Sequence, residues 1–278
     1  MLTLLTHSLD RLRLPLALAS LALAAGCAAV QTTGAGAVGV GRTQYVSPLV
    51  SPAQVEQAAA QAYAETLQAA RAQGALNRDA AEVRRVQGIA KRLIAQVPHF
   101  RPDAARWQWQ VNVIRSDEVN AWCMPGGRIA VYTGLIERLS PTDDELAAVI
   151  GHEIAHALRE HTREQMSQQM ATGLGLAVLG IATGSQQAVD LTGSLSQVMF
   201  TLPNSREFEA EADAIGVELA ARAGYDPRSA VTLWQKMGAL GGPARPEILS
   251  THPSPSSRIA NLQQLSQKVL PLYQGRAR

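Results

Sequence analysis

Cysteine is almost absent from this chain, with only Cys27 and Cys123 among 278 residues. Two cysteines provide no disulfide framework, so an exported domain would depend on its core and on any metal it binds. Aromatic residues make up only 4% of the sequence and the basic residues are scattered, which argues against a nucleic-acid partner. What is present is a hydrophobic fraction of 46%, ample for one sizeable domain.

The N-terminus has the three parts of a secretory signal over residues 1–27. Two arginines precede an apolar stretch at 14–25, which is too short for an ordinary membrane span, and small residues lead to Cys27. This order resembles a bacterial lipoprotein signal, in which Cys27 becomes the lipidated first residue. Ala24 stands where leucine is usual, and an ordinary cleaved signal with an incidental cysteine is the alternative. Ala28, instead of aspartate, favours the outer membrane, so we expect an exported, periplasmic, lipid-anchored protein.

The remainder divides into a tether and one domain. Residues 28–52 are rich in Gly, Ala, Ser and Thr, which predicts a flexible tether. Helical periodicity then begins, and we expect a single domain over 53–278. Its first two helices are predicted at Ala53–Arg71 and Ala80–Val97.

A small β-sheet is expected next. Trp107–Val113 alternates apolar and polar residues, which predicts a half-buried strand. Pro-Gly-Gly at 125–127 then forces a turn between the extended segment that begins at Asn120 and the strand-like Arg128–Tyr132, so a small hairpin is predicted. Its edge can bind an extended peptide by strand addition, or the hairpin can simply cover the core. The edge residues are Asn120, Ala121, Trp122, Cys123 and Met124. Cys123 is interpreted as an apolar filler, because no second thiolate accompanies it as a metal ligand.

The sequence His152-Glu153-Ile-Ala-His156 is the strongest chemical pattern. Thr142 and Glu145 form a predicted capping box at the start of its helix. Histidines four residues apart share one helix face, so both imidazoles can bind one metal ion. Glu153 then lies beside them as a general base toward water. His161, half a turn from that face on a continuous helix, is not expected to be a ligand.

An apolar, glycine-interspersed segment follows at 173–182. Ten residues are too few to cross a bilayer, so we expect a buried or loosely packed pair of helices near the site. Contact with a membrane or with substrate is the alternative interpretation.

An acidic helix is predicted after this segment. Glu209 and Asp213 share one face with Arg206, whereas Glu207 and Glu211 form a different row. The spacing allows one row to turn toward the metal while the other faces solvent.

Five motifs together resemble one family of zinc metallopeptidases, that of the CAAX prenyl protease and HtpX. They occur in the family's order: HEIAH at 152–156, NAxxxPGG at 120–127, TGL at 133–135, SRxxExxxD at 205–213 and THP at 251–253. The lipoprotein-like signal points to the periplasmic, LoiP-like branch. The expected fold is mostly α with a small β-sheet (α+β), of the zincin (gluzincin) type, with HExxH on a central helix.

The resemblance also implies roles for individual residues. One Zn²⁺ per chain would be held by His152, His156 and Glu209. Asp213 would orient a ligating imidazole. His252 would lie near the cleft, either as a latch on the metal or as a histidine that only anchors its loop. Arg206 and His252 are the candidates for stabilising the oxyanion.

The expected function is that of a zinc endopeptidase of the bacterial cell envelope, which cleaves misfolded or specific envelope proteins. Its partners would be unfolded or extended polypeptides and, through Cys27, a membrane; the sequence does not indicate an oligomeric state. The alternative is a lipid-anchored chaperone or binding factor whose zinc site is latched or structural. A zinc hydrolase that does not cleave peptides fits the hairpin less well.

Overall fold

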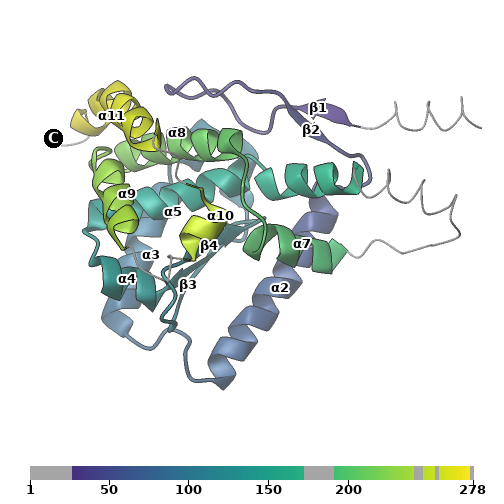
Figure 1. The fold of residues 1–278 in the computed structure, drawn as a ribbon, viewed down its shortest axis with the longest axis horizontal. Helices are drawn as coiled ribbons and strands as arrows, with labels where there is room; N and C mark the ends of the chain where they lie inside the picture. Colours follow the sequence, from purple (N-terminus) through teal and green to yellow (C-terminus); the bar gives the residue numbers. More distant parts are fainter. Residues whose placement is uncertain (1–26, 172–190, 241–246, 254–256, 276–278) are drawn as a thin grey trace, which may run out of the picture.

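Helix α5 (Asp143–Leu158) lies at the centre of the fold (Figure 1). The computed structural model describes residues 27–171, 191–240, 247–253 and 257–275. The predicted signal before Cys27 and the apolar segment at 173–182 are outside the described residues. Helix α5 packs on helix α8 (Arg206–Arg222) along one side and on strand β4 along another.

The start of α5 agrees with its predicted capping box. The Thr142 side chain accepts a hydrogen bond from the Glu145 backbone N–H (3.2 Å), and the Glu145 carboxylate accepts one from the Thr142 backbone N–H (2.9 Å). Every residue from Glu145 to Leu158 is buried. A helix with no exposed face is a core element, so its polar side chains must find partners inside the protein.

The sheet that contacts α5 has three strands in the order β3-β5-β4. They are β3 (Gln110–Ile114), β4 (Ala121–Met124) and β5 (Arg128–Tyr132). The predicted β4-β5 hairpin is present, and Gly126 and Gly127 form its turn with φ of 80° and 84°. Strand β3 pairs in parallel with β5 and begins only at Gln110, because Trp109 donates a backbone hydrogen bond to Trp107 in a turn.

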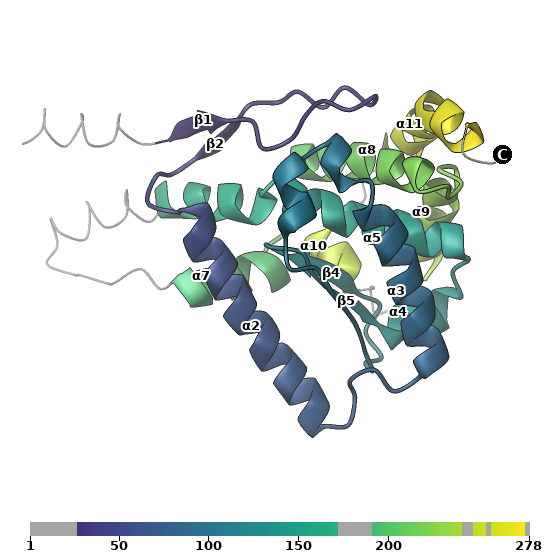
Figure 2. The same cartoon turned by 180° about the vertical axis from the view of Figure 1, so that it is seen from behind.

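The other helices surround this centre and confirm the predicted fold class of mostly α with a small sheet. They are α2 (Pro52–Ala72), α3 (Ala80–Ile94), α4 (Thr133–Leu139), α7 (Leu191–Phe200), α9 (Ser229–Ala239), α10 (Ile248–Thr251) and α11 (Ser257–Gln274), with 3₁₀ turns η1 (Val97–His99) and η2 (Pro102–Arg106) and a helical stretch at 161–171. Helix α10 lies on the side seen in Figure 1, and Figure 2 shows α2 and α3 on the reverse side. Helix α3 ends earlier than predicted because Pro98 disfavours helical backbone before it. Among these described helices, none has the length and hydropathy needed to cross a membrane.

Residues 28–50 differ from the expected flexible tether. They form an N-terminal strap that runs over α8 (Figure 1), with strands β1 (Ala28–Val30) and β2 (Gln44–Val46) paired antiparallel. Four apolar side chains of this segment are buried against the domain, and the overall composition of the segment did not indicate them: Val38, Val40, Val46 and Val50. Polar contacts add to them, since Val38 donates its backbone N–H to Glu218 of α8 (2.9 Å). Burial of these groups explains why a glycine-rich segment is fixed in place.

Candidate metal centre

Two glycines allow α5 and α8 to meet backbone to backbone. A Cβ atom added at Gly216 would lie 2.7 Å from the backbone nitrogen of His152, and one added at Gly151 would lie 2.9 Å from the Gly216 carbonyl oxygen. Larger residues would push the helices apart. The close approach lets the short side chain of Glu209 reach the two histidines of α5.

Four buried side chains converge at this crossing: His152, His156, Glu209 and His252. Each can offer one ligand atom, and these atoms all lie within 4.8 Å of one another. The Nε2 atoms of His152 and His156 are 3.0 Å apart, and Nδ1 of His252 lies 2.9 Å from Oε1 of Glu209. Helix α10 brings in His252, which follows its last residue. The structure therefore brings the three predicted ligands and the loop histidine together.

The donor set fits zinc. Imidazole nitrogen and carboxylate oxygen are ordinary zinc ligands, and three such ligands with room for a fourth are typical of catalytic sites. Asp213 Oδ1 lies 3.0 Å from Nδ1 of His152, which leaves Nε2 of that ring directed at the cluster. A bound cation would balance the buried charge of Glu209 and accept the converging lone pairs.

The pKa shifts of the cluster show how strongly its charged groups interact. Burial alone would lower the pKa of His152, but its hydrogen bonds to the carboxylates of Asp213 and Glu209 outweigh burial and raise the pKa to about 9. Burial lowers the pKa of His156 well below its usual value. For Glu209, burial acts to raise the pKa, yet His252 and His152 hold it well below the usual range. The site therefore stabilises an ionised carboxylate beside imidazoles.

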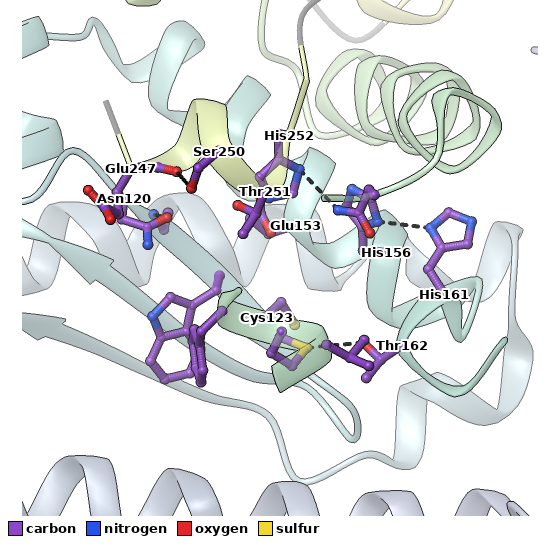
Figure 3. Close-up of a pocket in the computed structure, with 16 residues that line it drawn as sticks. Asn120, Cys123, Glu153, His156, His161, Thr162, Glu247, Ser250, Thr251 and His252 are labelled. Carbon is purple, nitrogen blue, oxygen red and sulfur yellow. Dashed lines mark hydrogen bonds and ion pairs between the residues drawn. The ribbon is translucent and has the colours of Figure 1, made fainter. Parts of the chain in front are cut away.

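Glu153 lies beside His156 and His252 in the cleft (Figure 3) and is not one of the four residues of the cluster. Its side chain is buried, and its Oε1 has no hydrogen-bond partner within the described part of the chain. Nε2 of His252 lies 3.6 Å from that oxygen. Burial raises the pKa of Glu153. A buried carboxylate oxygen without a partner can accept a proton from a water molecule in the cleft.

Arg258 of α11 is a site residue that the sequence did not reveal. Its Nη1 donates to Glu209 Oε2 (2.8 Å) and its Nη2 donates to Asp213 Oδ1 (2.6 Å). Its guanidinium lies over the ring of Trp234, 3.3 Å from the centroid. Arg206, the arginine that we considered as an oxyanion donor, is exposed at the start of α8 and does not line the cleft. The only sequence signal for Arg258 as a site residue was its position five residues after the Thr-His-Pro motif at 251–253.

The comparison with protein families agrees with this geometry. The model of peptidase family M48 matches residues 80–266, well over half of the chain, and that range contains the whole cluster. The chain belongs to peptidase family M48. The predicted zinc metallopeptidase family is thereby confirmed at this level, whereas the LoiP-like branch remains a prediction.

The chain is also similar to known metalloendopeptidases and proteases. The chain is 41% identical over 167 residues to the mitochondrial metalloendopeptidase OMA1 of Arabidopsis thaliana, which is 59% of this chain and 33% of that protein. It is 36% identical over 182 residues to human OMA1, covering 61% and 34%. It is 32% identical over 174 residues to the β-barrel assembly-enhancing protease of Escherichia coli, covering 58% and 35%. The chain thus spans about a third of the length of these relatives.

His161 of the M48 region makes contacts that its helix spacing did not predict. Helix α5 ends at Leu158, and Glu160 has a left-handed backbone with φ of 51°, so His161 is not on a continuous helix with His152. The turn brings Nδ1 of His161 to 2.8 Å from Nδ1 of His156. His161 is not in the four-residue ligand cluster, as expected, but the reason given by the spacing was wrong.

The cleft of the M48 domain runs past β4 (Figure 3), an edge strand whose outer side pairs with no other strand in the described part of the chain. Its lining residues from this edge are Asn120, Ala121, Trp122 and Cys123. Met124, the remaining residue of the predicted edge, is fully buried and does not line the cleft. The rings of Trp122 and Phe200 of α7 meet edge to face with centroids 5.6 Å apart, so α7 packs on the Trp122 side chain. Burial raises the pKa of the Cys123 thiol well above its usual value, which fits an apolar filler.

Proposed function

We propose that this protein is a zinc-dependent endopeptidase that hydrolyses peptide bonds of extended polypeptide segments. One observation carries the proposal: His152, His156 and Glu209 converge in a buried cluster directly beside Glu153, whose carboxylate oxygen has no hydrogen-bond partner among the described residues. A structural site has no need for such a carboxylate, whereas hydrolysis needs a base at this place.

The residues of the site suggest a division of labour. Zinc, when bound, polarises a peptide carbonyl and lowers the pKa of water. Glu153 accepts the proton of the attacking water as the new C–O bond forms, and passes that proton to the amide nitrogen as the C–N bond breaks. Asp213 holds the His152 ring through Nδ1, and Arg258 holds both Asp213 and Glu209. These contacts fix the ligand atoms before substrate arrives.

The substrate would bind along strand β4. A peptide in extended conformation can pair with the free edge of β4, which would place it beside Glu153 and His156 in the same cleft. Phe200 and α10 line the same cleft, so the peptide would lie between them and β4. A site of this form favours flexible, unfolded segments over folded proteins.

The cell envelope is the proposed location. The signal at residues 1–27 resembles that of a lipoprotein, and the related Escherichia coli protein is named as a β-barrel assembly-enhancing protease. On this basis we assign the protein to the periplasmic, LoiP-like branch, anchored through Cys27 at the outer membrane, with misfolded or specific envelope proteins as substrates. Labelling cells with radioactive palmitate tests the anchor, since Cys27→Ala should remove the label and release the protein from membranes.

A lipid-anchored chaperone or binding factor is the second candidate, and the position of His252 favours it. Four potential ligands would saturate a tetrahedral ion, as in structural zinc sites. The two functions differ in one respect, since a chaperone would prevent aggregation without cutting its client.

The deciding experiment is the substitution Glu153→Gln in the full chain. The amide cannot accept the proton from water, so cleavage of casein should fall by about a hundredfold or more while one zinc per chain remains. Glu207→Gln, at an exposed position of α8, is the matched control and should cut at the normal rate. A pure Glu153→Gln protein that cuts casein as fast as the wild type would refute the assignment.

A further inference from the structure

His161 is a buried imidazole with a defined place but no role in the mechanism above. Only 1% of its surface is exposed. Its Nδ1 lies 2.8 Å from Nδ1 of His156, and its Nε2 lies 3.0 Å from Oε2 of Glu211. Figure 3 shows His161 on the side of His156 away from His252. Its ring also stacks on Phe208, with centroids 4.4 Å apart and planes 8° from parallel.

His156, His161 and Glu211 form a row of hydrogen-bonded side chains, and the ligand geometry decides which nitrogen carries each hydrogen. Nε2 of His156 faces the metal cluster, 3.4 Å from Oε1 of Glu209. A neutral imidazole that coordinates through Nε2 carries its hydrogen on Nδ1, where His156 then donates to Nδ1 of His161. His161 must accept at Nδ1, so its own hydrogen is on Nε2 and is donated to the Glu211 carboxylate. Every donor in the row meets an acceptor.

Glu211 is itself held from two directions. Arg159 donates to it at 2.9 and 3.0 Å, and Arg42 of the N-terminal strap donates to it at 2.9 and 3.1 Å. Arg42 also forms an ion pair with Glu164 at 2.8 Å. The row that starts at the metal ligand therefore ends on a segment more than a hundred residues earlier in the chain.

We propose that His161 is a positioning residue for the zinc ligand His156, and that Glu211 and Arg42 of the strap hold His161 in place. His152 has Asp213 as the partner of its Nδ1, and His161 gives His156 the equivalent partner. Docking of the strap thereby sets how firmly the domain retains its metal. The inference uses the proposed function only for the identity of the metal, and zinc binding is measured apart from cleavage.

The first test compares three substitutions at His161 in the full chain. His161→Phe keeps the stacking on Phe208 but has no ring nitrogen. His161→Asn keeps an oxygen acceptor near the place of Nδ1, whereas His161→Gln reaches only toward Glu211. The measurements are zinc affinity by chelator competition, the rate of zinc loss, and the visible absorption of the Co²⁺-substituted protein.

We expect His161→Phe and His161→Gln to weaken zinc binding by about tenfold to a hundredfold and to change the Co²⁺ spectrum. His161→Asn should restore most of the affinity. If His161→Phe does not fold, as judged by circular dichroism, the Asn and Gln variants decide. Equal zinc affinity in those two variants, or wild-type affinity in a folded His161→Phe, would overturn the proposal. A wild-type chain that binds no zinc would instead contradict the proposed function.

The second test concerns the strap. Arg42→Met removes the contact with Glu211, and Lys268→Met is the matched control because Lys268 binds the strap at the Val38 carbonyl (2.8 Å) without contacting Glu211. Zinc should dissociate faster from Arg42→Met, by about tenfold, and at an unchanged rate from Lys268→Met. Equal rates in the two variants would show that the strap does not act through Glu211.

Discussion

Arg258 holds two buried carboxylates that face the ligand histidines. Its guanidinium is 2% exposed and bridges Glu209 and Asp213. Removing one member of a buried charged group leaves the others without a partner, which is costlier than losing a surface pair. We predict that Arg258→Met lowers the free energy of unfolding by about 3 kcal/mol, measured by urea denaturation of the metal-free protein.

Arg206→Met is the control for this prediction. Arg206 is exposed at the start of α8, so its loss should change stability by less than about 0.5 kcal/mol and leave cleavage intact. Loss of cleavage in Arg206→Met would revive its interpretation as an oxyanion donor. Equal stability of the two variants would contradict the role of Arg258.

His252 allows a prediction about the fourth ligand position. Its Nδ1 lies 3.3 Å from Nε2 of His152, where it can act as a ligand and block water. His252→Ala should therefore raise basal casein cleavage several-fold while weakening zinc binding, measured as initial rates at saturating zinc. Asn204→Ala, which removes a longer contact to the same ring (3.5 Å), should have little effect. A His252→Ala protein without activity would instead support an oxyanion-stabilising role.

At the scale of single residues, the sequence was informative where the chemistry is local. His152, Glu153 and His156 follow from helix spacing alone. Glu209 required the resemblance to a family, because two acidic rows of the same helix were equally suitable. Arg258 and His161 depend on tertiary contacts and on a break in the helix, and no periodic pattern contains that information.

At the scale of elements, the crossing of α5 and α8 fixes the ligand geometry. An added methyl group at Gly216 would overlap the backbone of His152 at 2.7 Å. Backbone atoms cannot move aside as side chains do, so the helices must separate. We predict that Gly216→Ala lowers the free energy of unfolding by about 2 kcal/mol and weakens zinc binding, measured by denaturation and chelator competition.

Gly88→Ala in α3 is the matched control, because nothing lies within 4 Å of the added Cβ. There the reduced freedom of the unfolded chain should raise stability by about 0.4 to 1 kcal/mol. If Gly216→Ala and Gly88→Ala changed the free energy of unfolding in the same direction, the packing argument would be contradicted.

The bounds of helices and strands could be predicted where a local sequence pattern, such as helical periodicity or strand alternation, marks the whole element. The predicted strand at Arg128–Tyr132 coincides with β5, and the predicted helix at Ala53–Arg71 differs from α2 by one residue at each end. The parallel pairing of β3 with β5 was not predicted, because alternation specifies a strand and not its neighbour. The strap was missed since its few valines are scattered among glycine and alanine.

At the scale of the whole molecule, the strap connects the predicted lipid anchor at Cys27 with Glu211 and His161, which lie behind the zinc ligand His156. Cys27 directly precedes β1, and Arg42 lies between Glu164 and Glu211. A charged network of this kind depends on its carboxylates remaining ionised. Burial opposes ionisation, but His161 and the two arginines outweigh it and lower the pKa of Glu211 to about 2.

This shift predicts how stability depends on pH. The usual glutamate pKa is 4.5, and the folded value is lower, so ionised Glu211 stabilises the fold fully above about pH 4.5 and loses its effect as pH falls toward 2. Allowing for partial solvent screening, the contribution is about 2 kcal/mol. Free energies of unfolding of wild type and Glu211→Gln should therefore differ at pH 6 and converge as pH decreases through this window. Glu207→Gln, at an exposed position of the same helix, should follow the wild type throughout. A constant difference between wild type and Glu211→Gln would mean that Glu211 acts through packing, and that the strap is held by its apolar contacts instead of by charge.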